Sequence, residues 1–224
     1  MLLTRRHALA SLAGASATLI LPQPARAAAE RVFRIERSGS NIGTHRIAVS
    51  REGELTRVAI DIDIVVRVLG IPAYRYEMTN RETWRDGELV SIDSRVNDDG
   101  AAKRVVASRN GAKVAITSEF VDKQVSPLVA TTTYVTPLFL DRPDWVSTDS
   151  GELLGVSATE LGPDRAGGGV ASTAWRASDG NGYDVVIHYD DRGEWVGLAF
   201  DAGGREAIYI ADSVDDRLAE VWAG

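Results

Sequence analysis

The fold is decided by the stretch Arg57–Val68, which reads RVAIDIDIVVRV. Apolar residues occupy every second position, and Arg57, Asp61, Asp63 and Arg67 lie between them. Because successive side chains of a strand point to opposite faces of a sheet, this period of two predicts an antiparallel strand with one buried face. The length of the pattern favours a long, curved strand.

Weaker alternation recurs along most of the remaining chain. It is found at residues 112–120, 182–190, 194–200 and 205–212. Gly-containing turn signals such as REGE, RDGE, NDDG, RNG and DAGG separate these stretches. The regular spacing predicts an all-β, mainly antiparallel fold with little helix. We expect one curved, meandering sheet that forms a barrel, a half-barrel or a β-spiral.

Two segments depart from the alternation. Residues 122–140 contain two prolines, which predicts a crossing segment or an irregular cover over one end of the sheet. The tail DSVDDRLAEVWAG, residues 212–224, predicts one short helix capped by Asp212 or Ser213. The apolar side of that helix is formed by Leu218, Val221 and Trp222.

The first 27 residues have the pattern of a signal peptide. Arg5 and Arg6 precede an apolar run over 8–21, and Ala25-Arg26-Ala27 resembles a small-residue cleavage site. The run is shorter than the roughly 20 residues that span a membrane. We expect residues 1–27 to direct export, with the arginine pair indicating the twin-arginine route and the general secretory route as the alternative.

Composition limits the chemistry of residues 28–224, which are expected to form a single β-barrel-like domain. The whole chain has a formal net charge of −7, and removal of residues 1–27 takes away three arginines and no acid. An acidic exported domain is a poor candidate for binding nucleic acid or anionic lipid head groups. The chain has no cysteine, which excludes disulfides, thiol catalysis and thiolate metal sites.

The hairpin predicted over Tyr74–Gly100 holds the main candidate site. A three-residue loop, Arg85-Asp86-Gly87, separates polar from apolar residues better than a two-residue loop does, because a single buried face specifies the register. The inner face then holds Tyr74, Tyr76, Met78, Glu82, Trp84, Val90, Ile92 and Val96.

Glu82 has two interpretations. A carboxylate on an inner face costs several kcal/mol unless it is paired or hydrogen-bonded. It is either a ligand-anchoring or proton-transferring acid with a raised pKa, or a structural acid that accepts from an indole N–H or from loop amides. The second interpretation is favoured.

Aromatic side chains and histidines complete the candidate site. The aromatic residues either line a ligand cavity or fill the core. His45 and His188 have no spacing typical of metal ligands, and neither a metal nor a cofactor is expected. The aromatic candidates for lining a cavity are Tyr74, Tyr76, Trp84, Trp145, Trp175, Tyr189 and Trp195. The predicted ligand-binding residues are Tyr74, Tyr76, Glu82, Trp84 and His45.

Three stretches resemble a known family. GSNIGTHRIAV (39–49), ETWRDGELVSIDSRVNDDG (82–100) and VVIHYDDRGEWVGLAFDAGGREAIYIA (185–211) are similar to exported Gram-negative proteins known only as a domain of unknown function. The resemblance covers most of residues 30–212 and extends, more distantly, to envelope-integrity proteins with an open β-spiral related to the lipoprotein-carrier fold. It implies a periplasmic barrel-like or half-barrel domain, and it carries over no catalytic residue.

These observations predict a non-enzymatic periplasmic protein that binds an apolar or amphipathic envelope molecule on the concave face of its sheet. The expected partner is lipid-like, with neither nucleic acid nor stable membrane insertion after cleavage. One alternative is a carboxylate enzyme in which Glu82 is the acid or base and Tyr74 or Tyr76 lies nearby. Another is a structural envelope factor that binds a protein partner through an exposed apolar patch or a sheet edge.

Overall fold

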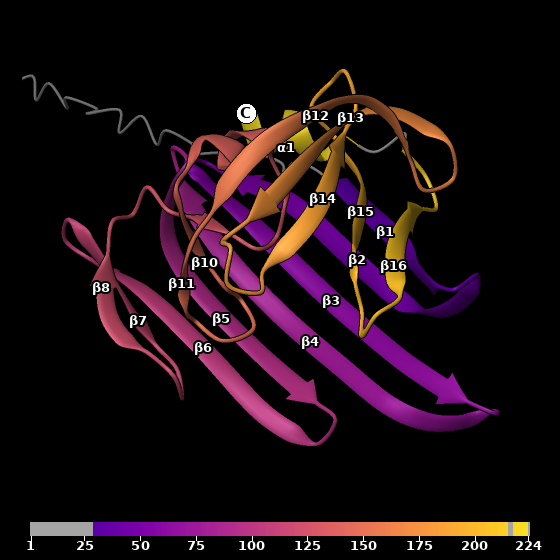
Figure 1. The fold of residues 1–224 in the computed structure, drawn as a ribbon. Helices are drawn as coiled ribbons and strands as arrows, with labels where there is room; N and C mark the ends of the chain where they lie inside the picture. The colour runs from indigo at the N-terminus through magenta and orange to yellow at the C-terminus, as the bar shows by residue number, and fades with distance from the viewer. Residues whose placement is uncertain (1–28, 215–216, 224) are drawn as a thin grey trace, which may run out of the picture.

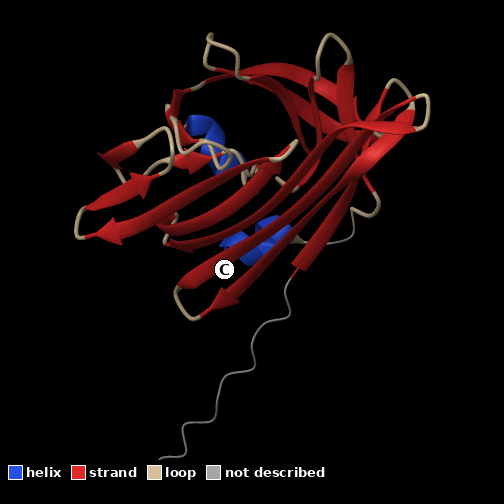
Figure 2. Cartoon of the chain, turned by 90° about the horizontal axis from the view of Figure 1, so that it is seen from below, coloured by secondary structure: helices blue, strands red, loops and turns tan. Residues whose placement is uncertain are grey.

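The protein is a half-barrel built from one large antiparallel sheet (Figures 1 and 2). The computed structural model describes residues 29–214 and 217–223, so the signal peptide predicted over 1–27 lies outside the described residues. Thirteen strands follow the order β12-β13-β14-β15-β16-β1-β2-β3-β4-β5-β6-β7-β8. The sheet curves without closing, because β12 and β8 remain its two edges. The predicted all-β, curved, meandering architecture is confirmed.

The bounds of the elements follow the turn signals of the sequence. The sheet strands are β1 (Ala29–Arg37), β2 (Ser40–Glu52), β3 (Leu55–Val68), β4 (Ile71–Arg85), β5 (Glu88–Asp98), β6 (Ala101–Asn110), β7 (Lys113–Thr117), β8 (Asp122–Val125), β12 (Ser157–Ala166), β13 (Val170–Ser178), β14 (Asp184–Tyr189), β15 (Trp195–Asp201) and β16 (Glu206–Ala211). A small second sheet contains β9 (Ala130–Thr131), β10 (Asp144–Val146) and β11 (Leu153–Gly155). The helices are the 3-10 helix η1 (Pro137–Asp141) and α1 (Leu218–Ala223).

The stretch that predicted the fold is β3. Val58 and Ile60 are buried on the concave face, whereas Arg57 is exposed on the convex one. β3 and β4 are longer than their neighbours and run on together past them at one end. β2 pairs with β3 only as far as Gly43 opposite Ile64, so the end of this hairpin is a free two-stranded ribbon.

The concave side is filled by the segment that was predicted to cross the sheet. Thr131 in this segment contacts Glu82 of β4, and three residues later the ring of Tyr134 lies 5.4 Å from that of Trp195 in β15. β4 and β15 are opposite walls of the half-barrel, because four strands separate them in the sheet order. The first residues of the segment, 122–125, form the edge strand β8 instead of a cover.

Two short helices close one end of the interior. At the closed end, the ring of Trp84 packs against Phe139 of η1 and Trp222 of α1, at centroid distances of 5.1 and 5.4 Å. The turn between β3 and β4 lies at the opposite end, which we call the mouth. The short C-terminal helix was therefore predicted correctly, and its role is to cover the closed end.

The cap predicted for this helix is wrong. α1 begins at Leu218, well beyond Asp212 and Ser213. A tertiary contact caps it instead, since the N–H of Ala219 in its first turn donates to the carboxylate of Glu194 over 3.0 Å.

The turn predicted for the β4–β5 hairpin is also wrong, although the predicted inner face is largely right. The loop contains two residues, Asp86 and Gly87, both with positive φ, a geometry that matches the twist of the flanking strands. A bulge then leaves Val90 unpaired, so Glu82 lies opposite Ile92 and keeps the inward face that was predicted for it. Because the bulge shifts the side chains between it and the turn, Leu89 occupies the core where Val90 was expected.

Candidate functional site

β4 supplies four of the five predicted site residues from one face. Its even-numbered side chains point to the concave side, because strand side chains alternate. Ten residues separate Tyr74 from Trp84, which places them about 30 Å apart at a rise of roughly 3.3 Å per residue. In order from the mouth to the closed end, these side chains are Tyr74, Tyr76, Met78, Asn80, Glu82 and Trp84. The structure therefore does not bring the predicted residues into one site.

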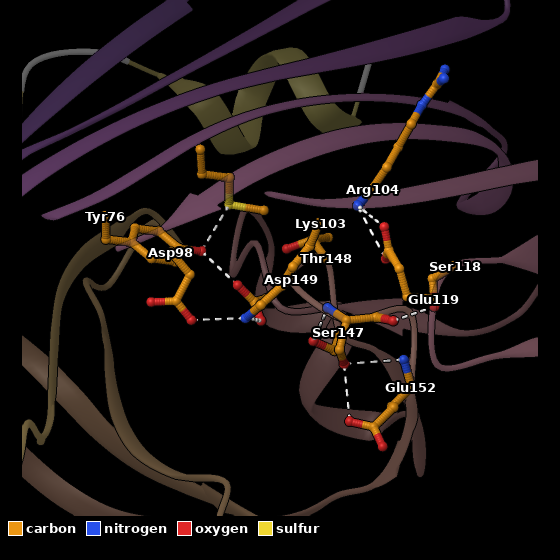
Figure 3. Close-up of polar contacts among 12 residues, drawn as sticks. Tyr76, Asp98, Lys103, Arg104, Ser118, Glu119, Ser147, Thr148, Asp149 and Glu152 are labelled. Atoms are coloured by element: carbon orange, nitrogen blue, oxygen red, sulfur yellow. Dashed lines mark hydrogen bonds and ion pairs between the residues drawn. The ribbon is translucent and has the colours of Figure 1, made fainter. Parts of the chain in front are cut away.

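At the mouth, five polar side chains form a connected network that we call the mouth cluster: Tyr74, Tyr76, Asp98, Lys103 and Asp149. The ammonium of Lys103 donates to Asp98 over 2.9 Å and to Asp149 over 3.0 Å. The hydroxyl of Tyr76 donates to Asp149 over 3.0 Å, and that of Tyr74 donates to Asp98 over 2.8 Å. Figure 3 shows the ammonium of Lys103 between the carboxylates of Asp98 and Asp149, with the hydroxyl of Tyr76 joined to Asp149.

The contacts of the mouth cluster shift the pKa values of Lys103, Asp98 and the two tyrosines. Burial acts to lower the pKa of Lys103, but the hydrogen bonds and charges of Asp98 and Asp149 outweigh it and raise that pKa. Hydrogen bonds from Lys103 and then Tyr74 lower the pKa of Asp98. Burial first, and contact with the carboxylates second, raises the pKa of both tyrosines. At neutral pH these shifts favour an ammonium on Lys103, a carboxylate on Asp98 and protonated phenols on the two tyrosines.

Three members of the mouth cluster were missed by sequence reasoning. Asp98 had been taken for an ordinary turn residue of NDDG. Lys103 shares its face of β6 with the buried Val105 and Ala107, so a lysine on the apolar face of an amphipathic strand was a readable signal. Asp149 comes from a loop 46 residues further on, and nothing in the local sequence marks it.

Beside the mouth cluster, the concave face carries an apolar surface that we call the mouth strip. It consists of three cross-strand pairs on one face of β3 and β4. Of these residues, Ile62 and Ile64 pack against the core. All but Met78 are at least partly exposed, so this surface extends the core toward solvent. The pairs are Ile62 with Met78, Ile64 with Tyr76, and Val66 with Tyr74. The two tyrosines belong to both the strip and the cluster, which makes the mouth amphipathic.

Glu82 lies deeper, fully enclosed, with 2% of its surface exposed. Its carboxylate accepts from the indole N–H of Trp84 over 2.8 Å, from the amide of Asn80 over 2.9 Å and from the hydroxyl of Thr131 over 3.2 Å. Burial outweighs these hydrogen bonds and raises the pKa of Glu82 to about 7. The geometry is that of a structural acid joining β4 to the crossing segment.

Trp84 and the other candidate tryptophans are packed into the core. Trp84, Trp145 and Trp195 have no exposed surface, and Tyr189 is 3% exposed. The hydroxyl of Tyr189 donates to main-chain oxygens of the crossing segment. Trp175 is only partly buried. These rings therefore fill the space that was considered for a ligand cavity.

His45 lies in an aromatic enclosure of the core. Its ring is 5.3 Å from Trp195, 5.5 Å from Tyr209 and 6.1 Å from Phe33 between centroids. It is 3% exposed, and neither ring nitrogen has a hydrogen-bond partner within the described residues. Burial lowers the pKa of His45 to about 3, so the imidazole is neutral under ordinary conditions.

His188 is buried in the sheet. Only 6% of it is exposed, and its Nδ1 lies 3.1 Å from the hydroxyl of Ser172. Burial lowers its pKa. Within residues 29–214 and 217–223, no three histidine or acidic side chains are grouped as a metal site would require.

Comparison with known proteins is consistent with this architecture. A beta-barrel-like protein of the domain of unknown function DUF1849 from Brucella abortus has a similar structure, with a TM-score of 0.57 and 9% sequence identity. The similarity covers 85% of this chain and 98% of that one, and at this identity it shows the fold alone. No curated protein matches the sequence. The model of the domain of unknown function DUF6134 matches residues 33–212, and the chain therefore belongs to the DUF6134 family.

Proposed function

We propose that this is a non-enzymatic periplasmic binding protein that holds an amphipathic envelope molecule at the mouth of its half-barrel. The observation that carries the proposal is the meeting of the mouth strip and the mouth cluster at Tyr74 and Tyr76. The strip offers apolar contact to an acyl or similar chain. The cluster offers hydrogen bonds to a polar head, and a few placed polar groups beside an apolar surface are typical of small-molecule sites.

The charges of the cluster limit the head group. Asp98 and Asp149 exceed the single ammonium of Lys103 by one negative charge. A head with an ammonium or hydroxyl donor therefore suits the cluster better than a purely anionic one. A single-chain zwitterionic lipid such as lysophosphatidylethanolamine has both parts.

The state of the ionisable groups supports binding over catalysis. A general acid or base works best when its pKa lies near the working pH and it can reach the substrate. The contacts within the mouth cluster raise the pKa of Lys103 and lower the pKa of Asp98, so both values move away from neutral pH. Glu82 has the appropriate pKa, but its carboxylate is enclosed by Asn80, Trp84 and Thr131.

The periplasmic location rests on the signal-peptide pattern of residues 1–27. The positive start, the apolar run and the small-residue end are typical of export. An envelope location would place the mouth in reach of membrane-derived amphiphiles.

Fluorescence titration with lysophosphatidylethanolamine labelled at its acyl end tests the proposal. Ile64→Asp places a charge in the mouth strip and should weaken binding by about tenfold or more, because the apolar chain would contact a carboxylate. Val106→Asp is the matched control, since Val106 is an exposed valine on the convex face of β6. Thermal unfolding checks that both variants fold. Absence of saturable binding, or equal loss in both variants, would contradict the proposal.

A further inference from the structure

The tip of the β3–β4 hairpin is an apolar surface with no neighbour in the fold. β2 stops pairing at Ile64, and the last main-chain hydrogen bond to the β5–β6 turn runs from the N–H of Asp99 to the carbonyl of Arg75. The backbone of residues 65–74 therefore projects as a two-stranded ribbon, by about 15 Å at a rise of roughly 3.3 Å per residue. The projecting hairpin is seen at the lower right of Figure 1. Three of its apolar side chains are largely in solvent: Val68 at 59%, Leu69 at 98% and Ile71 at 70% exposed.

The turn at this tip differs from its counterparts in the same sheet. Four hairpins turn on two residues with positive φ, the second of which is glycine. The polar residue expected at the first position is present in three of them, whereas the fourth has leucine. The four pairs are Ser38-Gly39, Leu69-Gly70, Asp86-Gly87 and Asp99-Gly100.

Leu69 is therefore unfavourable for the isolated chain in two ways. Its φ of +51° is a left-handed conformation that costs free energy for a residue with a branched side chain and is better tolerated by asparagine or aspartate. Its side chain is also almost wholly in water. An apolar patch that contributes nothing to its own fold is typical of a surface that meets another phase or molecule.

The charge of the tip selects the partner. Residues 64–76 contain Arg67 and Arg75 and no acidic residue, although the chain as a whole has a net charge of −7. Arg75 is paired with Glu77 and Asp63, whereas Arg67 is exposed and has no ion pair within the described residues. The end of the ribbon therefore carries the positive charge of Arg67, whereas Asp98 and Asp99 lie at its base, against Tyr74 and Arg75.

We propose that the β3–β4 tip inserts into the surface of a lipid bilayer that carries anionic head groups. Val68, Leu69 and Ile71 would enter the boundary of the acyl region, with Tyr74 and Arg67 at the level of the head groups. The proposed attachment is peripheral, through the tip alone. Within the described residues no helix is both long and apolar enough to cross a bilayer. The proposal does not depend on a ligand at the mouth.

Vesicle co-sedimentation tests this proposal. The protein is recovered from the soluble extract of producing bacteria, and mass spectrometry first establishes that all variants share one N-terminus. The probes are vesicles of phosphatidylcholine alone and of phosphatidylcholine with phosphatidylglycerol. Wild-type protein should bind the mixed vesicles more tightly. Leu69→Asn should weaken binding to both by about tenfold or more. Arg67→Gln should weaken binding about fivefold on the mixed vesicles only.

The matched control is Leu161→Asn, which changes a leucine of β12 that is 57% exposed and should leave vesicle binding unaltered. Because asparagine suits the left-handed turn, Leu69→Asn should also raise Tm by about 2–4 °C, which a structural role of Leu69 would not allow. The proposal is overturned if wild-type protein sediments with neither kind of vesicle. Unchanged binding by Leu69→Asn, or a tip-dependent dimer in analytical ultracentrifugation, also overturns it.

Discussion

The indole N–H of Trp84 donates to the carboxylate of Glu82 over 2.8 Å, although both residues project from one strand into the core. Thr131 of the crossing segment donates to the same carboxylate oxygen. Trp84 in turn packs on η1 and α1. This pair therefore connects the sheet, the segment that fills it and the helices that close one end.

Replacing Glu82 by glutamine should reduce the dependence of stability on pH. The folded pKa of about 7 exceeds the ordinary glutamate value of 4.5, so between these values the folded chain keeps a proton that the unfolded chain releases. The wild-type free energy of unfolding thus falls as pH rises through this window, by about 3 kcal/mol from this group. Urea unfolding at about pH 4 and pH 8 measures it.

The control for this prediction is Glu160→Gln, which removes an exposed carboxylate of β12. Its pH profile should follow that of the wild type. If Glu82→Gln also keeps the wild-type profile, Glu82 is not the buried, proton-holding group described here.

Replacing Trp84 by phenylalanine should destabilise the protein by about 2–4 kcal/mol, because it removes buried contact area and leaves the Glu82 carboxylate without its shortest hydrogen bond. A double-mutant cycle with Glu82→Gln isolates the contact. We expect a coupling free energy of about 1–3 kcal/mol. Strict additivity of the two single changes would show that the indole and the carboxylate do not interact.

Replacing His45 by leucine should make the protein more resistant to acid. The folded pKa of about 3 lies below the ordinary histidine value of 6.5, so below pH 6.5 the unfolded chain binds a proton that the folded chain does not bind. Stability from this group is complete above about pH 6.5 and is lost as pH falls toward 3. The difference in unfolding free energy between variant and wild type should therefore grow on acidification. A difference that is constant from pH 7 to pH 4 would contradict the assignment.

Replacing Gly43 by alanine should prevent folding or cost several kcal/mol, because a Cβ at this position would lie 2.1 Å from the carbonyl oxygen of Asp63 in the paired strand. Gly155→Ala in β11 is the control, since nothing lies within 4 Å of its added carbon. Thermal unfolding compares the two variants. Equal Tm values would mean that β2 and β3 are not in this register.

The sequence predicted the strands well because burial on one face leaves a period-two record, as in β3. It did not reveal how the β4–β5 register arises. A three-residue loop and a two-residue loop followed by a bulge at Val90 place Glu82 on the same face of the sheet, so the alternation pattern cannot distinguish them. The structure distinguishes them through the positive φ of Asp86 and Gly87.

The site was predicted less well for a physical reason. Tyr74 and Tyr76 were found through their shared strand face, but Asp149 meets Lys103 only through the path of a distant loop. Likewise, alternation shows which aromatic side chains point inward and not whether another segment fills the space between them. Tyr134 and Thr131 occupy that space next to Trp195 and Glu82.

Native mass spectrometry of the protein isolated from the periplasm of producing bacteria tests the central claim most directly. The proposal predicts a bound amphiphile of one chemical class on the wild-type chain and on Val106→Asp, and its loss from Ile64→Asp. A wild-type chain that carries no ligand, or an Ile64→Asp chain that retains the same ligand, would contradict binding at the mouth.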